Sequence, residues 1–468
     1  MDMMDTEKLR KRQSLKVIVS EAIMVLAVVI MVTVLALIVS GYWLGSDFKV
    51  ERQGMIQVAS IPTGADLDID GQSSWLQRTN TSKVLASGPH TVTISKEGYD
   101  TWSREINISE GLLYRLHYPR LFLKDRTPEK ILDISGALQA TISPARDKLL
   151  LVNGTTEWQL VKLKDDTLEP KELDISEFFS NTSLADGAKV GLFTGKILTM
   201  DWDRSGSHVL FKVDNTGSTE WILLDVDNIK NTINLTKEFG ADFDIVEILD
   251  NSSSNLIASQ DGNLRKIDVP GKSISAVLAE EVFSFDHYEN EIVYSSAGPS
   301  NTYLVSLLKI GDDESTQLET TTEPVKVAIS KFYDDMYITA LQDTTLKLYK
   351  KVDFTPVSEY QLTFSPEIME VGHNGEFITM YSGAQLATLD MEAATVVEWT
   401  IDGDTFGWLD NDMIYSVADG ELFVYDFNGL NRRALAKNVS SHFPAAITDD
   451  KWLYYVSDGN LTRERITK

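Results

Sequence analysis

The histidines are the first residues to test for chemistry, because imidazole serves both as a general base and as a metal ligand. The chain has six of them, at His90, His117, His208, His287, His373 and His442. No two lie three or four residues apart, which excludes the helical motif in which two histidines face one zinc ion. The chain also contains no cysteine. It therefore has no thiolate nucleophile, no disulfide and no cysteine-ligated metal site.

Two acidic segments have the residue pattern that opens a calcium-binding loop. Residues 66–71 read Asp-Leu-Asp-Ile-Asp-Gly, and residues 201–206 read Asp-Trp-Asp-Arg-Ser-Gly. A complete loop needs a bidentate glutamate at its twelfth position, where these segments have Gln77 and Lys212. We therefore predict the solvent face of a strand at the first segment, with Leu67 and Ile69 on its other face, a turn of a blade at the second, and no metal site.

Motifs of other enzyme classes are incomplete. Gly191, Gly195 and Lys196 approach the spacing of a phosphate-binding loop, but one residue is missing and no Ser or Thr follows the lysine. The Gly-x-Ser-x-Gly motif of serine hydrolases does not occur. We therefore assign no catalytic, cofactor-binding or metal-binding residue, expect no cofactor, and predict that the chain is not an enzyme.

Acidic residues dominate the composition, with 70 Asp and Glu against 43 Lys and Arg and a net charge of -27. Such a surface repels the phosphates of nucleic acids, so we expect no nucleic-acid partner. Carboxylates are so numerous that no pair can be singled out from the sequence. A glycosidase nevertheless needs only two of them at a suitable separation.

The elements that would position these side chains begin with an apolar segment. Residues 22–39 are eighteen residues without a charge, enough helix to cross a hydrocarbon core of about 30 Å at ~1.5 Å per residue. Apolar residues at 17–19 and 42–44 extend this segment, so we predict a transmembrane helix over residues 17–44. The apolar core of a cleaved signal peptide is shorter, at about 7–15 residues.

The charges beside this segment predict its orientation. Residues 1–16 carry five basic residues against three acidic ones, and basic flanks stay on the cytoplasmic side of a membrane. We therefore predict a signal anchor with a cytoplasmic basic tail at residues 1–16. A linker at residues 45–54 and everything after it are predicted to be extracytoplasmic.

Residues 55–125 have the pattern of short strands. Ile56 and Val58 alternate with outward-facing positions, Leu67 and Ile69 do the same, and residues 90–95 repeat the pattern. Glycine and proline stand between these runs. Alternation at period two with such turns predicts half-buried strands joined by hairpins.

The motifs of this segment resemble those of the PEGA domain, a small β-sandwich of bacterial and archaeal surface proteins. The matching residues are Val58-x-Ser60-x-Pro62-Thr63-Gly64-Ala65, Asp70-Gly71, Gly88-Pro89-His90-Thr91-Val92-Thr93-Ile94 and Gly98-Tyr99. Thr63 stands where the family has a glutamate. The resemblance implies a β-sandwich, cell-surface attachment and contact with carbohydrate, and it brings no catalytic residues.

Residues 126–468 contain a recurring unit, which is clearest in an apolar strand that follows a polar turn. The eight such strands lie at 148–152, 208–212, 255–258, 291–294, 336–339, 376–379, 412–416 and 451–455. Most start about 40 residues apart, the period of a four-stranded propeller blade. We predict a propeller of eight blades, with seven as the alternative because the first interval is longer. Its turns resemble those of WD-repeat and TolB-type propellers.

Ring closure and blade packing also follow from this pattern. The last unit supplies only three strands, so we expect residues 129–134 to provide the fourth and to join the two ends of the ring. Trp158, Trp221 and Trp452 lie within predicted strands. We expect them to pack between blades, where large apolar surfaces are buried, rather than to form a sugar-stacking platform.

The sequence thus predicts an all-β ectodomain, a PEGA-like sandwich and a seven- or eight-bladed propeller, behind a single N-terminal transmembrane helix. We expect a single-pass protein of the cell membrane that acts as a non-catalytic binding or scaffold protein of the cell envelope. Its expected partners are the lipid bilayer and an envelope protein or glycan. The alternative is an extracellular carbohydrate-active hydrolase with a carboxylate pair in the propeller funnel.

Overall fold

The structure is a computed structural model that divides into two compact units, residues 1–124 and 125–468. It describes residues 21, 23–36, 42–44, 50–164, 168–179, 195–215, 217–249, 254–312, 314–352, 354–403 and 405–468. The predicted cytoplasmic tail, residues 17–20, 22 and 37–41 of the predicted transmembrane helix, and the first half of the predicted linker lie outside these residues. Each unit is described by itself.

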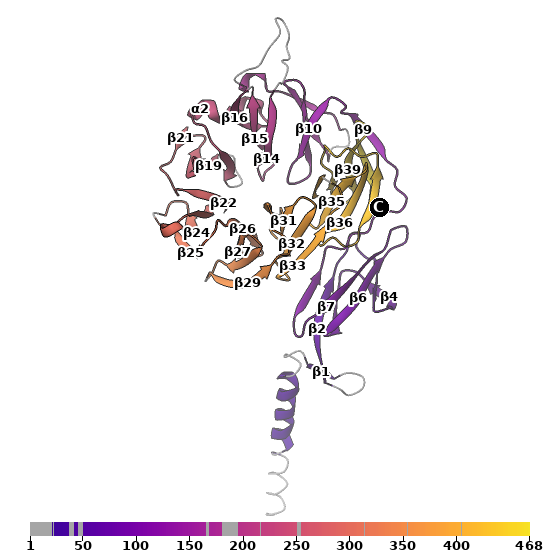
Figure 1. The fold of residues 1–468 in the computed structure, drawn as a ribbon. Helices are drawn as coiled ribbons and strands as arrows, with labels where there is room; N and C mark the ends of the chain where they lie inside the picture. Colours follow the sequence, from indigo (N-terminus) through magenta and orange to yellow (C-terminus); the bar gives the residue numbers. More distant parts are fainter. Residues whose placement is uncertain are drawn as a thin grey trace, which may run out of the picture. The chain divides into compact units, whose positions relative to one another are not determined.

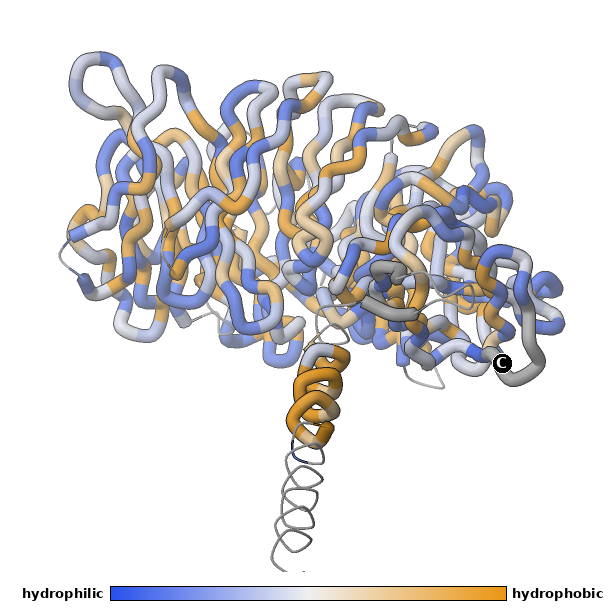
Figure 2. The backbone as a smooth tube through the Cα atoms, turned by 90° about the horizontal axis from the view of Figure 1, so that it is seen from below, coloured by the Kyte–Doolittle hydropathy of each residue, from blue (hydrophilic) through white to orange (hydrophobic). Residues whose placement is uncertain are grey.

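Residues 23–36 form a helix that is apolar on all sides (Figure 2). Its large side chains are about half exposed or more, from 48% at Val34 to 64% at Met24. Among the described residues, no helix has both the length and the apolar character needed to span a membrane.

Residues at the end of the predicted transmembrane segment have a different structure. Tyr42–Leu44 forms strand β1, which pairs with the start of β2 (Val50–Val58). The helix prediction is wrong for these three residues, because backbone pairing with β2 and the strand preference of Tyr and Trp favour the extended form. For the same reason, the second half of the predicted linker belongs to β2.

The first unit contains two four-stranded sheets. In one, β2 lies between β1 and β5 (Thr81–Ala86) and also pairs in parallel with β8 (Leu113–Leu116). The other has the order β4-β3-β6-β7, formed by Gln72–Arg78, Asp66–Ile69, Gly88–Ser95 and Trp102–Ile108. The alternation predicted from the sequence is confirmed, since Ile56, Val58 and Leu67 are at most 1% exposed while Met55 is 42% exposed.

The second unit contains eight four-stranded antiparallel sheets arranged as blades around a central axis (Figure 1). Blade 1 comprises β10 (Ala137–Ile142), β11 (Lys148–Asn153), β12 (Glu157–Lys162) and β13 (Lys171–Asp174), and blade 2 comprises β14 (Lys196–Trp202), β15 (His208–Asn215), β16 (Ser218–Asp225) and β17 (Ile233–Asn234). Blade 3 comprises β18 (Ile245–Leu249), β19 (Asn255–Gln260), β20 (Asn263–Asp268) and β21 (Ser273–Ile274). Blade 4 comprises β22 (Val282–Tyr288), β23 (Glu291–Ala297), β24 (Tyr303–Lys309) and β25 (Thr316–Thr321). Short helices at Ser176–Phe178 (η1), Ile229–Asn231 (η2), Leu235–Phe239 (α2) and Pro299–Asn301 (η3) lie in the connections.

The remaining blades have the same strand order. Blade 5 comprises β26 (Lys326–Phe332), β27 (Asp335–Gln342), β28 (Thr345–Lys350) and β29 (Thr355–Gln361), and blade 6 comprises β30 (Ile368–Val371), β31 (Phe377–Ser382), β32 (Gln385–Asp390) and β33 (Thr395–Thr400). Blade 7 comprises β34 (Thr405–Trp408), β35 (Met413–Ala418), β36 (Glu421–Asp426) and β37 (Arg433–Lys437). Blade 8 comprises β38 (Ala446–Thr448), β39 (Trp452–Ser457), β40 (Asn460–Arg465) and β9 (Glu129–Asp133). Eight sheets match the preferred count of the sequence repeats.

The second strand of each blade is the apolar strand that marks the repeat. In β11, four consecutive residues are buried, because both faces of the blade pack against neighbouring blades. Asp-Gly pairs close the following hairpin in three blades, at 261–262, 419–420 and 458–459, and both residues of each pair have a positive φ. Two positive φ values give a turn whose twist matches that of paired strands.

Strand β9 closes the ring as predicted. Leu132 pairs with Leu461 of β40, and Arg463 donates to Glu129 across the same two strands at 2.8 Å. The predicted packing of tryptophan between blades is also confirmed. Trp158 of blade 1 contacts Phe211 of blade 2, with ring centroids 5.1 Å apart. Trp221 and Trp452 pack in the clusters between blades 2 and 3 and between blades 8 and 1.

Candidate functional site

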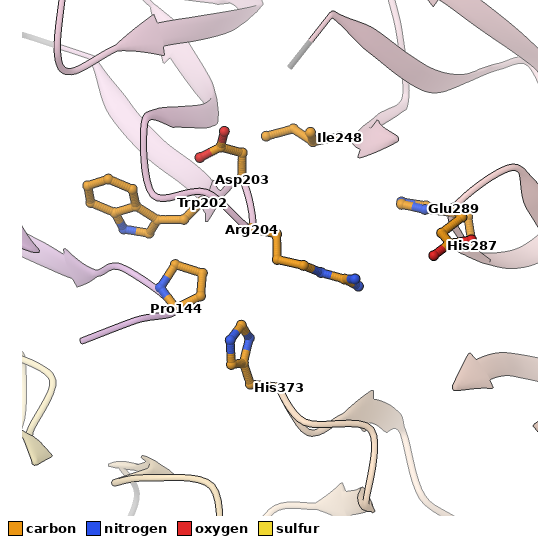
Figure 3. A pocket seen from close by; sticks show the side chains of 8 residues that line it. All are labelled: Pro144, Trp202, Asp203, Arg204, Ile248, His287, Glu289 and His373. Carbon is orange, nitrogen blue, oxygen red and sulfur yellow. The ribbon is translucent and has the colours of Figure 1, made fainter. Parts of the chain in front are cut away.

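The turns that follow the first strand of several blades meet at one end of the central axis. A cavity of about 200 Å³ is lined by residues from blades 1, 2, 3, 4 and 6 (Figure 3). A second cavity of about 340 Å³ shares Arg204, His287 and His373 with the first and extends to blade 5. Residues from so many blades converge only at the axis of a ring. We call this site the channel mouth, defined by Arg204, His287, Lys331 and His373.

Arg204 is the central side chain of the channel mouth. Figure 3 shows its guanidinium extending into the cavity between His373 and His287. Its Cζ lies 5.1 Å from the ring centroid of Tyr288, a distance typical of a cation–π contact. Within the described residues, the guanidinium makes neither a hydrogen bond nor an ion pair with the protein.

The turn that carries Arg204 is held rigidly by the preceding residue, Asp203. The Oδ1 atom of Asp203 accepts hydrogen bonds from the backbone N–H groups of Ser207 and His208 at 2.8 and 2.9 Å. Its Oδ2 atom accepts from the Ser205 hydroxyl at 2.6 Å. The Asp203 carboxylate is therefore occupied by its own turn. These bonds lower the pKa of Asp203 despite the opposing effect of burial.

The two histidines of the channel mouth are neutral at pH 7. Burial, with a smaller effect from the Arg204 charge, lowers the pKa of His287 to about 4. Burial also lowers the pKa of His373, and the charges of Arg146 and Arg204 act in the same direction. The Nε2 atom of His287 lies 3.6 Å from Oε2 of Glu247. Its buried Nδ1 atom has no hydrogen-bond partner among the described residues.

Carboxylates belong to the first strands of blades 2, 3, 4 and 6: Asp201 in β14, Glu247 in β18, Asp286 in β22 and Glu370 in β30. Burial is the main cause that raises the pKa of Glu247 well above its usual value, and the charges of Asp286 and Asp201 raise it further. Burial, followed by the charge of Glu370, raises the pKa of Asp201.

Asp286 has a structural partner as well as a raised pKa. Its Oδ2 accepts from the backbone N–H of Ile329 at 2.8 Å, which satisfies the open edge of β26 in the next blade. Burial raises the pKa of Asp286 to about 6 although this bond and one from the N–H of His287 oppose the shift. Asp286 thus connects two blades and also has a pKa close to neutral pH.

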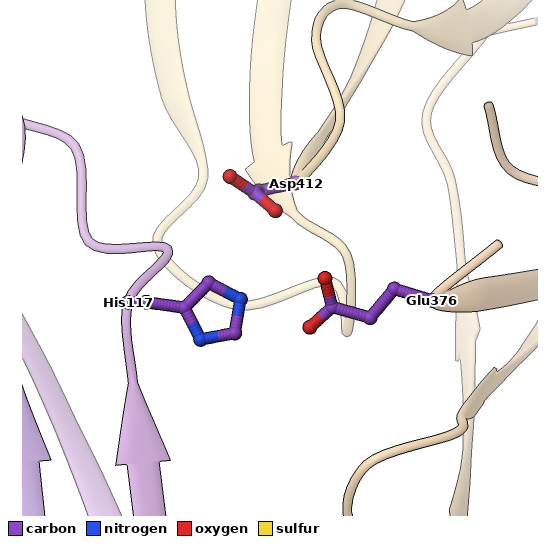
Figure 4. Close-up of side chains that lie close together, drawn as sticks. All are labelled: His117, Glu376 and Asp412. Atoms are coloured by element: carbon purple, nitrogen blue, oxygen red, sulfur yellow. The ribbon is translucent and has the colours of Figure 1, made fainter. Parts of the chain in front are cut away.

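A second pair of carboxylates lies elsewhere in the propeller. Oxygen atoms of Glu376 and Asp412 lie within 4.8 Å of each other (Figure 4). The side chain of Asn374 donates to Glu376 at 3.0 Å. Figure 4 also labels His117, which belongs to the first unit. Among the described residues of the propeller, Glu376 and Asp412 are the members of this group.

The first segment with a calcium-like sequence is strand β3 followed by a turn at Asp70 and Gly71, and the second ends in a turn of blade 2, as predicted. Asp68 accepts from the backbone N–H of Gly71 at 2.8 Å, and Asp70 lies 2.6 Å from His90 Nδ1. The second segment is the turn held by Asp203. In both places, neighbouring backbone and side-chain donors occupy the carboxylates.

The sequence did not single out Arg204, His287 or His373, because they lie far apart in the chain. Their shared position within the repeated units was the one sequence signal that could have identified them. Each follows or ends the first strand of its blade, so an alignment of the repeats places all three at the same end of the ring.

A family model for the PEGA domain matches residues 53–119. These residues form a PEGA domain. The match covers the two-sheet region of the first unit and bears out the resemblance seen in the sequence motifs. No curated protein matches the chain.

Solved structures with partial similarity include several with low identity to this chain. A computationally designed protein, Ika8, has a TM-score of 0.43 at 10% identity, covering 72% of this chain and 99% of its own. An oligogalacturonate lyase in complex with manganese has a TM-score of 0.40 at 14% identity, with coverage of 57% and 88%. PorZ, a surface component of the type-IX secretion system of Porphyromonas gingivalis, has a TM-score of 0.41 at 14% identity, with coverage of 70% and 42%. At these scores we draw no conclusion from them.

Proposed function

We propose that this chain is a membrane-anchored, extracytoplasmic binding protein of the cell envelope, and that its propeller holds a ligand without transforming it. The observation that carries the proposal is the channel mouth. Turns from several blades place a guanidinium that has neither a hydrogen bond nor an ion pair among the described residues, two neutral imidazoles and a lysine around one pair of cavities. Converging polar groups in a concave site are typical of ligand recognition.

The helix at residues 23–36 supports anchoring in a membrane. Its large apolar side chains are exposed on all sides, and an apolar helix without a protein partner is stable when lipid covers it. The basic residues of the preceding segment favour a cytoplasmic N-terminus. The PEGA domain supports a location at the cell surface.

Binding is tested with the full chain in detergent micelles. The chain is probed with an array of cell-wall glycans, peptidoglycan fragments and envelope proteins, and the products of every bound glycan are analysed. We expect binding without cleavage, and we expect the Arg204→Gln variant to weaken it. A chain that binds no member of the array would contradict the proposed function.

The raised pKa values in the channel favour one other function, hydrolysis of a glycan. Glu247 holds its proton to a higher pH than usual, which suits a general acid, and other carboxylates lie near it. In this alternative, product analysis finds cleaved glycan, and Glu247→Gln abolishes cleavage while binding persists. Asp390→Asn is a matched control, because burial raises the pKa of Asp390 to about 6 at a site away from both cavities.

A further inference from the structure

Resting on the proposed binding function, we propose that the channel mouth recognises an anionic group, a carboxylate or phosphate carried by an envelope polymer. The site that takes this group is centred on the guanidinium of Arg204, and Lys331, His287 and His373 line the same cavities. These four side chains come from blades 2, 4, 5 and 6.

Two cations lie at the channel mouth of an acidic protein. The formal net charge is -27, yet two cationic side chains of the channel mouth, Arg204 and Lys331, have no ion pair within the described residues. Burial is the main cause that lowers the pKa of both histidines of the mouth, and the charge of Arg204, with that of Arg146 at His373, acts in the same direction. The carboxylates of Glu247 and Asp286 lie in the same channel, so an anion is held by direct contact with the guanidinium and not by a positive field of the whole site.

The carboxylates near the mouth leave the guanidinium available. Asp203 accepts four hydrogen bonds or close contacts from its own turn and from His208. Asp286 accepts from two backbone N–H groups. Glu289 lines the cavity but is exposed and lies beyond ion-pair distance of Arg204. A ligand thus meets a guanidinium whose hydrogen-bond donors have no acceptor among the described residues, while its Cζ lies 5.1 Å from the ring centroid of Tyr288.

The chemistry of these groups selects an oxyanion. A guanidinium donates two parallel hydrogen bonds to a carboxylate or phosphate, and this fork geometry favours such groups over hydroxyls. Pro144, Trp202 and Ile248 supply apolar surface beside the guanidinium in the same cavity. The site therefore suits an anionic group attached to a larger, partly apolar body such as a sugar ring.

The test measures binding to the full chain in uncharged detergent micelles by calorimetry. One probe is a hexasaccharide with alternating glucuronate residues, and its control is the same glycan after reduction of the carboxyl groups to alcohols. The second probe is a glycerol-phosphate hexamer, with inorganic phosphate as the minimal anion. The two probes distinguish a carboxylate source from a phosphate source. Each titration is repeated at low and high salt.

We expect at least one acidic probe to bind, with affinity that falls as salt rises, and the reduced glycan to bind at least tenfold more weakly. Arg204→Gln and Lys331→Gln should each lower the affinity about tenfold or more, with unchanged melting temperatures. Lys309→Gln is the matched control, because Lys309 is an exposed residue of β24 away from both cavities.

Three results overturn the inference. The reduced glycan binds as tightly as the acidic one, the acidic probes bind independently of salt, or Lys309→Gln weakens binding as much as Arg204→Gln. In each of these cases the chain still binds a ligand, so the proposed function survives. If none of these probes binds while the wider array contains a neutral ligand, the inference again fails alone.

Discussion

Two groups at the channel mouth have pKa values displaced in opposite directions by the same burial. The pKa of Asp286 is raised to about 6 and that of His287 is lowered to about 4, because a site with few solvent contacts disfavours both the anion and the cation. Their effects on stability therefore oppose each other. As pH falls from 6.5 towards 4, Asp286 gains a proton more readily in the folded state, and His287 gains one more readily in the unfolded state.

The contribution of His287 can be separated by mutation. Between pH 6.5 and 4 the unfolded chain binds more protons at this position than the folded chain, so the wild-type histidine lowers stability as pH falls. Between pH 7.5 and 4.5 the wild-type histidine should lower the free energy of unfolding by about 2 kcal/mol, and His287→Gln should abolish this decrease. Thermal unfolding of the full chain at the two pH values measures the difference. His442→Gln, at an exposed position, is the control. An equal acid sensitivity of wild type and His287→Gln would contradict the assigned environment.

At the scale of the elements, the channel mouth depends on how closely the turns of adjacent blades approach. Gly375, in the turn after β30, has a φ of 75°, and a side chain there would overlap the carbonyl oxygen of Lys331 in blade 5. This contact fixes the position of Lys331 relative to His373. The geometry of the site thus depends on a glycine that lines its second cavity.

We expect Gly375→Ala to destabilise the chain and to weaken ligand binding, because it adds both a strained φ and a clash with backbone. The control is Gly383→Ala in the same blade, where φ is 56° and the space is open. In the control, backbone strain alone should lower the free energy of unfolding by about 1 kcal/mol. Gly375→Ala should lower it by clearly more. Chemical unfolding measures both. Equal losses would show that the blades do not meet as described.

Closure of the ring by β9 permits a covalent test. Asp133 lies opposite Asn460 in the antiparallel pair of β9 and β40, and the chain has no cysteine of its own. A double substitution, Asp133→Cys with Asn460→Cys, should form one disulfide in the folded protein. Because the bond closes a very long loop, we expect it to raise the free energy of unfolding by about 4 kcal/mol. Reduction of the disulfide should abolish this increase. Failure to oxidise without denaturant would contradict the closure.

At the scale of the whole molecule, the proposed topology puts the N-terminal tail on one side of a membrane and both globular units on the other. Protease added to intact cells should digest the chain beyond about residue 45 and spare an epitope tag placed at the N-terminus. Digestion after the cells are lysed is the control for access to the tag. A tag lost from intact cells while residues 51–468 survive would reverse the orientation.

The sequence by itself determined which segments become strands. Alternation places Ile56 and Leu67 inside the first unit, and the apolar run at 148–152 recurs as the second strand of a blade, because burial on one or both faces dictates the local pattern. It also favoured eight repeats over seven, which the structure confirms, and it identified the strand that closes the ring. These features depend on neighbours along the chain or on a repeated period, both of which a single sequence contains.

Only the tertiary structure decided the channel mouth. Arg204, His287, Lys331 and His373 are separated by up to 169 residues and belong to four different blades. Their convergence follows from closure of the ring, which brings equivalent turns of every repeat to one axis. The lowered pKa values of His287 and His373, and the absence of a hydrogen bond or ion pair at Arg204 among the described residues, likewise depend on burial and on distances across that axis. Residue type and spacing carry no record of those distances, so the site appears only when the ring is assembled.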